Sequence, residues 1–190
     1  ITGAAKRIGA QTARTLHEAG WNIALHYRES ANEAKQLAAE LNTQRANSAA
    51  IFQADLRQTA SWEGLITWAH GLWGRLDGLV NNASAYYATP MGRITPADFD
   101  ELFASNLRAP LFLTQAAAPY LQAQHGAIVN IVDVQIETNY LVYTMAKAGL
   151  LALTKQCAQE LAPHIRVNAV SPGAILWPEH LGWSEAMRDQ

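Results

Sequence analysis

Short apolar runs alternate along this chain with longer segments in which apolar residues recur at helical spacing. The short runs are rich in Ile, Val and Leu, a pattern typical of strands that are buried on both faces of a sheet. They cover Trp21 to Tyr27, Ala49 to Ala54, Leu76 to Asn81, Ala127 to Val132 and Ile165 to Val170. The helical segments cover Ala10 to Ala19, Ala31 to Leu41, Ser61 to Trp73, Pro96 to Leu121 and Tyr143 to Leu161. The alternation predicts an α/β fold, with a single doubly wound parallel sheet and helices on both faces.

We expect residues 1–190 to form one domain whose two ends are incomplete. A glycine-rich turn at residues 2–9 requires a strand before it, of which only Ile1 is present. Residues 174–190 read as the beginning of a substrate lid, where Trp177 and Trp183 either line a substrate pocket or pack within the lid. Ligands of such sheets bind at the carboxyl ends of the strands, and the candidate residues below lie at those ends.

The composition excludes several classes of function. Hydrophobic residues make up 49% of the chain and charged residues 16%, and the formal net charge is −2, so nothing favours binding to nucleic acid or to a membrane. No apolar run approaches the roughly 20 residues of a membrane span, and we expect a cytoplasmic protein. Cys157 is the only cysteine, which excludes an internal disulfide and a multi-cysteine metal site. We predict no metal.

The segment TGAAKRIG at residues 2–9 leads directly into a helical pattern. Backbone amides and a helix amino terminus at such a place can hold a pyrophosphate. Gly3 would permit the tight turn and Gly9 the close packing of the helix, with Arg7 and Ile8 beside the phosphates. The segment predicts a dinucleotide-binding turn.

The strand end about 20 residues farther on is where the choice between NAD and NADP is usually made. It reads His26, Tyr27, Arg28, Glu29 and Ser30. Arg28 and Arg7 can supply guanidinium groups to a 2′-phosphate, and Ser30 a hydroxyl, which favours NADP. Glu29 is the counter-argument, because an inward carboxylate would bind a ribose diol. Alternatively, Arg28 and Glu29 form an exposed ion pair and His26 is a solvated strand end.

Later strand ends carry further candidates for the same cofactor. They are Asp55 and Leu56, Asn82 and Ala83, and Pro172 and Gly173. The carboxylate of Asp55 can accept from the adenine amino group, or else it caps the turn that follows. Small and amide residues at 82–83 let the chain pass close to a ligand, and the Pro-Gly turn suits close approach to a nicotinamide.

Tyr143 and Lys147 lie one helical turn apart and share a helix face. At that distance the ammonium of Lys147 favours the phenolate of Tyr143 and lowers a pKa that is otherwise about 10. The pair predicts a proton donor that works near neutral pH. Such pairs also occur by chance in many helices, so the meaning of this one depends on the other motifs.

Together these motifs resemble, in order, those of the short-chain dehydrogenase/reductase family. The matching residues are Thr2, Gly3 and Gly9, Asn81 to Ala83, Asn106, Tyr143 with Lys147, and Pro172 with Gly173. The resemblance implies a Rossmann-type domain, a nicotinamide cofactor and a homotetramer formed through the long helices. It also implies that Asn106 holds a water in a proton relay, that Tyr143 donates the proton and that Lys147 binds the nicotinamide ribose. Asn106 is otherwise an ordinary helix amide.

Departures from the general family pattern resemble its pteridine reductase branch. Arg7 replaces the middle glycine of the turn, and Asp133 stands where a serine is common. Ser84, Ala85 and Tyr86 follow the Asn-Asn-Ala motif where a glycine is usual. By this resemblance, Arg7 and Ser84 would contact a pterin substrate, and Tyr86 would stack on it against the nicotinamide.

The chemistry of Asp133 independently favours reduction of a C=N bond. A serine can donate to a carbonyl oxygen, whereas an ionised aspartate can only accept. Asp133 therefore suits an amino-bearing or protonated heterocycle, and with Tyr143 and water it can pass a proton to a ring nitrogen. NADPH would deliver hydride to the ring carbon of a dihydropterin, with dihydrofolate as a further substrate. Asp133 otherwise caps a helical turn.

Asp133 and Tyr143 are ten positions apart, a few fewer than the family usually has. Either the loop is short, which puts their pairing in doubt, or part of it is absent from the sequence, which we favour. Two other functions stay open: a carbonyl reductase of the same fold that acts on a 3-oxoacyl thioester, sugar or steroid, and a non-catalytic NADP-binding regulator. The intact Asn106, Tyr143 and Lys147 argue against the regulator, and the branch-specific residues argue against the carbonyl reductase.

Overall fold

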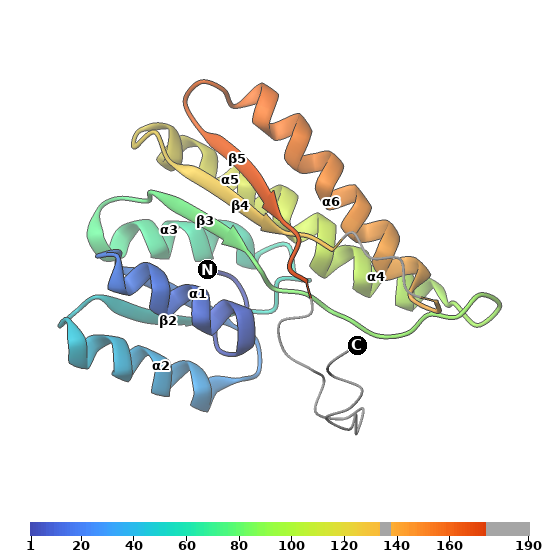
Figure 1. Ribbon diagram of the computed structural model, residues 1–190, viewed down its shortest axis with the longest axis horizontal. Helices are drawn as coiled ribbons and strands as arrows, with labels where there is room; N and C mark the ends of the chain where they lie inside the picture. The colour runs from blue at the N-terminus through green and yellow to red at the C-terminus, as the bar shows by residue number, and fades with distance from the viewer. Residues whose placement is uncertain (134–137, 174–190) are drawn as a thin grey trace.

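The computed structural model describes residues 1–133 and 138–173, in which parallel strands alternate with helices (Figure 1). The strands are β1 (Ile23–Tyr27), β2 (Ala49–Gln53), β3 (Gly78–Asn81), β4 (Ala127–Ile131) and β5 (Arg166–Val170). The helices are α1 (Arg7–Glu18), α2 (Ala31–Gln44), α3 (Ser61–Trp73), α4 (Pro96–Phe103), the π-helix η1 (Ala104–Arg108), α5 (Ala109–Gln122) and α6 (Leu141–Glu160). The predicted α/β fold is confirmed.

The strands form two hydrogen-bonded groups that residues 1 and 2 join. β1 pairs with β2, and β4 lies between β3 and β5, always in parallel. The carbonyl of Ile1 accepts from the amide of His26 at 3.0 Å, and the amide of Thr2 donates to the carbonyl of Val80 at 2.9 Å. Residues 1 and 2 therefore occupy a strand position between β1 and β3, and the glycine-rich turn follows directly from it.

Two apolar clusters hold the helices on the strands. One joins α1 and α2 to β1 and includes the buried residues Leu25 and Leu41. The other joins α3 and α5 to β3 and β4, with Trp62 stacked on Phe112 at 4.8 Å between ring centroids. α6 packs against α4, η1 and β5 (Figure 1). Because the strands are parallel, their carboxyl ends share one edge, and η1 and α6 bring their polar residues to it.

The helix predicted for Pro96 to Leu121 is interrupted at its centre by η1. Asn106 lies in this turn, and its Nδ2 donates to the carbonyls of Leu102 and Ala85, both at 2.9 Å. Single π turns occur frequently at functional sites. The apolar periodicity could not reveal this one, because the bond to Ala85 joins segments that are distant in sequence.

Other boundaries differ from the predicted ones by a few residues. α1 begins at Arg7 rather than Ala10, and α6 begins at Leu141 rather than Tyr143. Within the described residues, no helix combines the length and the apolar character that crossing a membrane requires.

Candidate active site

The glycine-rich turn is packed so closely that only glycine fits at two of its positions. A Cβ on Gly3 would lie 2.8 Å from Cα of Ala83, and Gly3 has a φ of +60°. A Cβ on Gly9 would lie 2.4 Å from the carbonyl oxygen of Gly3. Asn82 links the end of β3 to the turn, because its Nδ2 donates to the carbonyls of Thr2 and Gly3 at 2.9 and 3.0 Å. The turn and the end of β3 thus form one close-packed floor, and its approach to a ligand stays a prediction.

Arg7 opens α1 with a backbone that side chains rarely adopt. Its φ is +51°, in the left-handed region where most residues cost about 1–2 kcal/mol relative to glycine. The amino terminus of α1 has no side-chain cap and no acidic residue in its first turn. Its orphan amides and the positive end of the helix dipole therefore suit an anion such as a pyrophosphate.

His26 fixes this turn to the end of β2. Its ring is 4% exposed; Nδ1 accepts from the amide of Gly3 at 3.1 Å, and Nε2 lies 3.0 Å from the carbonyl oxygen of Ala54. Those two contacts require a neutral ring with the proton on Nε2. Burial lowers the pKa of His26 to about 4, which keeps the ring neutral. His26 is thus a buried support beneath the turn rather than the solvated strand end of the alternative interpretation.

The predicted 2′-phosphate region holds two ion pairs. Arg28 Nε lies 2.9 Å from Oε1 of Glu29, and Lys6 Nζ lies 2.6 Å from Oε1 of Glu33 at the start of α2. All four side chains are well exposed to solvent, so each cation can exchange its partner for a phosphate. Sequence reasoning missed Lys6, although its place beside Arg7 in the turn was a usable signal.

Asp55 fits the alternative interpretation, in which it caps the turn that follows, because its Oδ1 accepts from the backbone amide of Arg57 at 3.0 Å. Both of its carboxylate oxygens accept from the guanidinium of Arg57, which also bonds to Glu101 on α4 at 2.9 Å. These hydrogen bonds lower the pKa of Asp55 and keep it ionised. The predicted acceptor for the adenine amino group is therefore already in a bidentate pair. Arg57, two residues farther on, was not among the predicted site residues.

A cavity of about 450 Å³ runs along these strand ends. Its walls join cofactor candidates with substrate candidates, from Gly3, Arg28 and Asp55 to Ser84 and Tyr86. Its volume suits a ligand of moderate size. The structure therefore brings some of the predicted cofactor and substrate residues to a common hollow, whereas Arg7, Asp133 and Tyr143 do not line it.

Tyr143, Asp133 and Lys147 come together beside β4. The hydroxyl of Tyr143 donates to Oδ2 of Asp133 at 3.2 Å, so the short spacing does not prevent their contact. Nζ of Lys147 donates to the carbonyl of Ile131 at 2.8 Å and lies 5.7 Å from the centre of the Tyr143 ring. Burial lowers the pKa of Lys147 to about 8, while the charge of Asp133 opposes this shift.

Asn106 is fully buried and connects this centre to the segment after β3. Its Oδ1 accepts from the hydroxyl of Ser84 at 2.6 Å, while its Nδ2 is held by the carbonyls of Leu102 and Ala85. The amide is therefore fixed by its surroundings and in turn orients Ser84. This arrangement differs from that of an ordinary amide within a regular helix.

Two tyrosines, Tyr86 and Tyr140, form an aromatic wall next to Tyr143. The rings of Tyr86 and Tyr140 stack at 4.5 Å with an angle of 11° between their planes, and Tyr86 meets Tyr143 edge-on at 4.8 Å. Tyr86 is 51% exposed, so its ring is accessible to a planar ligand. Tyr140 was not among the predicted residues, although an aromatic residue one helical turn before Tyr143 was a signal for it.

Some predicted residues are not tied to the site by the described contacts. Pro172 and Gly173 follow β5, and no hydrogen bond joins them to the other candidates within the described residues. Trp177 and Trp183 lie outside the described residues. In the described part of the chain, no group of His, Cys, Asp and Glu residues could hold a metal ion.

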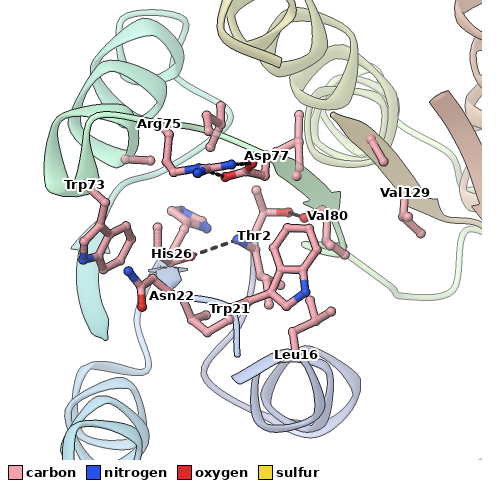
Figure 2. Close-up of a pocket in the computed structure, with 18 of the residues that line it drawn as sticks. Thr2, Leu16, Trp21, Asn22, His26, Trp73, Arg75, Asp77, Val80 and Val129 are labelled. Carbon is pink, nitrogen blue, oxygen red and sulfur yellow. Dashed lines mark hydrogen bonds and ion pairs between the residues drawn. The ribbon is translucent and has the colours of Figure 1, made fainter. Parts of the chain in front are cut away.

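A larger cavity, of about 670 Å³, lies away from this centre (Figure 2). It lies between β1 and β3, with Trp21 and Trp73 on its walls and the ion pair of Arg75 and Asp77 at its side. Most of its wall is apolar and consists of facing strand residues and the helices that cover them. Ile1 and Thr2, which lie between β1 and β3, also line this cavity. The cavity lacks the convergent polar groups that are typical of a ligand site.

Comparisons with known proteins agree on one group of enzymes. A model of the short chain dehydrogenase family matches residues 1–185. Pteridine reductase 1 of Leishmania tarentolae is 39% identical over 226 aligned residues, which cover 97% of this chain and 78% of that protein. The 3-oxoacyl-(acyl-carrier-protein) reductase of Staphylococcus aureus is 32% identical over 195 residues, covering 100% of this chain and 79% of that protein. An uncharacterized oxidoreductase of Methylorubrum extorquens is 36% identical over 181 residues, 93% of this chain and 72% of that protein.

Proposed function

The chain belongs to the short-chain dehydrogenase/reductase family of oxidoreductases, and from this premise we propose that it is an NADPH-dependent pteridine reductase. It reduces a C=N bond of a dihydropterin, with dihydrofolate as a further substrate. The observation that carries the proposal is the contact of the Asp133 carboxylate with the Tyr143 hydroxyl at 3.2 Å. A carboxylate at this place accepts from amino and protonated ring groups, which pterins have and simple ketones lack.

The cofactor fits the residues that would hold it. The uncapped amino terminus of α1 suits the pyrophosphate, and the close-packed Gly3 and Gly9 keep the floor free of side chains. Arg28 and Lys6 supply positive charge for a 2′-phosphate, and Ser30 supplies a hydroxyl. Glu29 is the argument for NAD, because its carboxylate lies 2.9 Å from Arg28 and competes with a phosphate for that guanidinium.

The reduced nicotinamide, when bound, supplies the hydride. Tyr143 and Asp133 share a hydrogen bond through which a proton can move toward the substrate nitrogen. Lys147, with a pKa of about 8, is mostly charged at neutral pH and favours the phenolate of Tyr143. The hydroxyl of Ser84 donates to Oδ1 of Asn106 at 2.6 Å, which orients Ser84. In this proposal Ser84 hydrogen-bonds a polar group of the pterin.

In this proposal, the substrate binds against the aromatic wall. Tyr86 is accessible, stacks on Tyr140 and stands at an edge to Tyr143, so a flat heterocycle on this wall lies beside the proton donor. Aromatic stacking of this kind contributes about 0.5–1.5 kcal/mol beyond the area that is buried. Arg7, exposed at the start of α1, contributes a guanidinium from the cofactor side.

Carbonyl reduction is the second candidate, because the staphylococcal relative named above is a 3-oxoacyl reductase. The test is a direct comparison of NADPH oxidation with dihydrobiopterin, dihydrofolate and a 3-oxoacyl thioester. We expect turnover with the pterins and little with the thioester. Turnover with the thioester alone would overturn the proposal, and no turnover with any of them would favour a non-catalytic NADP-binding regulator.

We also propose that the chain forms a homotetramer through its long helices. Leu111 on α5 and Met145 on α6 are 39% and 46% exposed, and such large apolar side chains favour burial against another copy. Size-exclusion chromatography with light scattering tests this assembly. Replacing Leu111 with Glu should lower the measured mass, and a wild-type mass equal to that of one chain would contradict the proposal.

A further inference from the structure

Thr89 joins the segment after β3 to the start of α6. It is 2% exposed and lines neither cavity. Its amide donates to the carbonyl of Asn139 at 2.6 Å, and Thr89 forms a parallel bridge with Tyr140. Its hydroxyl Oγ1 accepts from the amide of Val142 at 3.2 Å. One buried residue therefore binds both the approach to α6 and the first turn of this helix.

The hydroxyl of Thr89 supplies what the helix itself lacks. The first amides of an α-helix have no partner within it and are usually satisfied by the residue that precedes the helix. That residue, Tyr140, makes no side-chain cap. Thr89 takes over this role from a different segment, so the beginning of α6 is fixed by a residue about fifty positions earlier in the chain.

The two segments that Thr89 joins carry opposite parts of the proposed active centre. Tyr86 and Ser84 lie shortly before it, whereas Val142 immediately precedes Tyr143. Tyr86 also joins these two segments, because it stacks on Tyr140 and makes an edge contact with Tyr143. A shift between these two segments would move the aromatic wall relative to the phenol of Tyr143.

We propose that Thr89 is a positioning residue, whose buried hydroxyl sets the register between the substrate-binding segment and the helix that carries Tyr143. The inference rests on the proposed assignment of Tyr143 as proton donor. Thr89 lies outside the lining of both cavities, so its role is one of positioning. It acts by holding Tyr143 where the transferred proton is needed, and misplacement of a reacting group by about 1 Å can reduce a rate about 100-fold.

A pair of matched variants tests the role of the hydroxyl. Thr89→Val keeps the branched shape but removes the acceptor, leaving the buried amide of Val142 without a partner. Thr89→Ser keeps the acceptor and removes only a methyl group. We expect Thr89→Val to lower kcat at least about tenfold, with the Kd for NADPH changed less than about twofold, and Thr89→Ser to retain kcat within about threefold.

The pH profile separates positioning from a general loss of structure. In Thr89→Val, the apparent pKa that the kcat/KM profile reports for Tyr143 and Lys147 should shift. Thr89→Ser should keep the wild-type profile. An unchanged kcat in folded Thr89→Val would overturn the inference. An equal loss in both variants, or a parallel loss of NADPH affinity, would overturn it as well.

Hydrogen exchange keeps the inference testable if Thr89→Val does not fold. In the wild-type protein the amide of Val142 should exchange as slowly as amides in the middle of α6, and rapid exchange would contradict the cap. The kinetic ratios are measured with whichever substrate the wild type reduces, pterin or 3-oxoacyl thioester. Activity on the thioester alone would contradict the pterin assignment. The role of Thr89 would then be tested by the same kinetic ratios, measured with the thioester.

Discussion

Tyr143 lies at the meeting point of a carboxylate, a buried ammonium and an aromatic wall. Its pairing with Lys147 could be predicted from sequence, because residues four apart share a helix face. Its contact with Asp133 could only be hypothesised, since the spacing of the two residues was unusual, and the structure brings them to 3.2 Å. Tyr140 and Lys6 were missed although each lies near a predicted residue in the sequence, and their contacts with Tyr86 and Glu33 join separate segments.

Replacing Tyr143 with Phe should remove the proton donor and little else. We expect kcat to fall by about 10²–10⁴-fold, the usual contribution of a positioned general acid. The Kd for NADPH, measured by fluorescence titration, should change less than about twofold, because the hydroxyl bonds to Asp133 and not to the cofactor floor. Tyr120→Phe on α5 is the matched control and should keep wild-type turnover. Full activity of Tyr143→Phe would refute the assigned role.

Arg28 tests the choice of cofactor. Loss of a charge-assisted hydrogen bond to a phosphate costs about 1.5–3 kcal/mol, or roughly 10–100-fold in affinity. Arg28→Ala should weaken NADPH by about this factor and NADH less than about twofold, as measured by isothermal titration calorimetry. Arg75→Ala, which breaks a surface pair with Asp77 away from the site, is the control. An equal loss for both cofactors would remove Arg28 from the 2′-phosphate site.

Among the elements, the alternation of strands and helices could be predicted from the apolar pattern, because the strands carry short apolar runs and each helix has one packed face. The break of the predicted helix Pro96 to Leu121 could not, because Asn106 takes its partners from Leu102 and from Ala85 in another segment. The same reason hides the cap of α6, which Thr89 supplies from outside the helix. Local patterns predict elements, whereas contacts between distant segments place the active centre.

The turn before α1 combines backbone strain with a functional side chain at Arg7. With φ at +51°, Arg7→Gly should relieve strain that Arg7→Ala retains. We expect the free energy of unfolding of Arg7→Gly to exceed that of Arg7→Ala by about 1 kcal/mol in urea denaturation. Both variants should bind NADPH and pterin more weakly than the wild type. Equal stability of the two would contradict the strain, and wild-type binding by both would contradict the role of the guanidinium.

In the molecule as a whole, one sheet edge brings together the glycine-rich turn, the aromatic wall and Tyr143. Three buried or half-buried connections hold these parts together: His26 between the turn and β2, Asn106 between η1 and the segment after β3, and Thr89 between that segment and α6. Each joins segments that are far apart in sequence. Breaking such a connection should therefore disturb the relative placement of these parts.

Acid should break the connection at His26. Its folded pKa of about 4 lies below its unfolded value of 6.5, so the neutral ring stabilises the fold above pH 6.5, and this contribution is lost as the pH falls toward 4. The difference corresponds to about 3 kcal/mol. Urea denaturation across this range should show the loss in wild type and in the exposed-surface control His164→Gln, but not in His26→Gln. A pH dependence in His26→Gln equal to that of the wild type would contradict this account.

Transfer of the hydride from NADPH to a pterin ring distinguishes a pteridine reductase from the other candidate functions. The wild-type protein is incubated with dihydrobiopterin and NADPH that carries deuterium at C4 of the nicotinamide, and the pterin product is examined by mass spectrometry. We predict a tetrahydropterin that carries one deuterium on a ring carbon, formed at a rate that Tyr143→Phe lowers by about 10²–10⁴-fold. Oxidation of NADPH without a labelled pterin, or labelled product only from a 3-oxoacyl thioester, would contradict the assignment as a pteridine reductase.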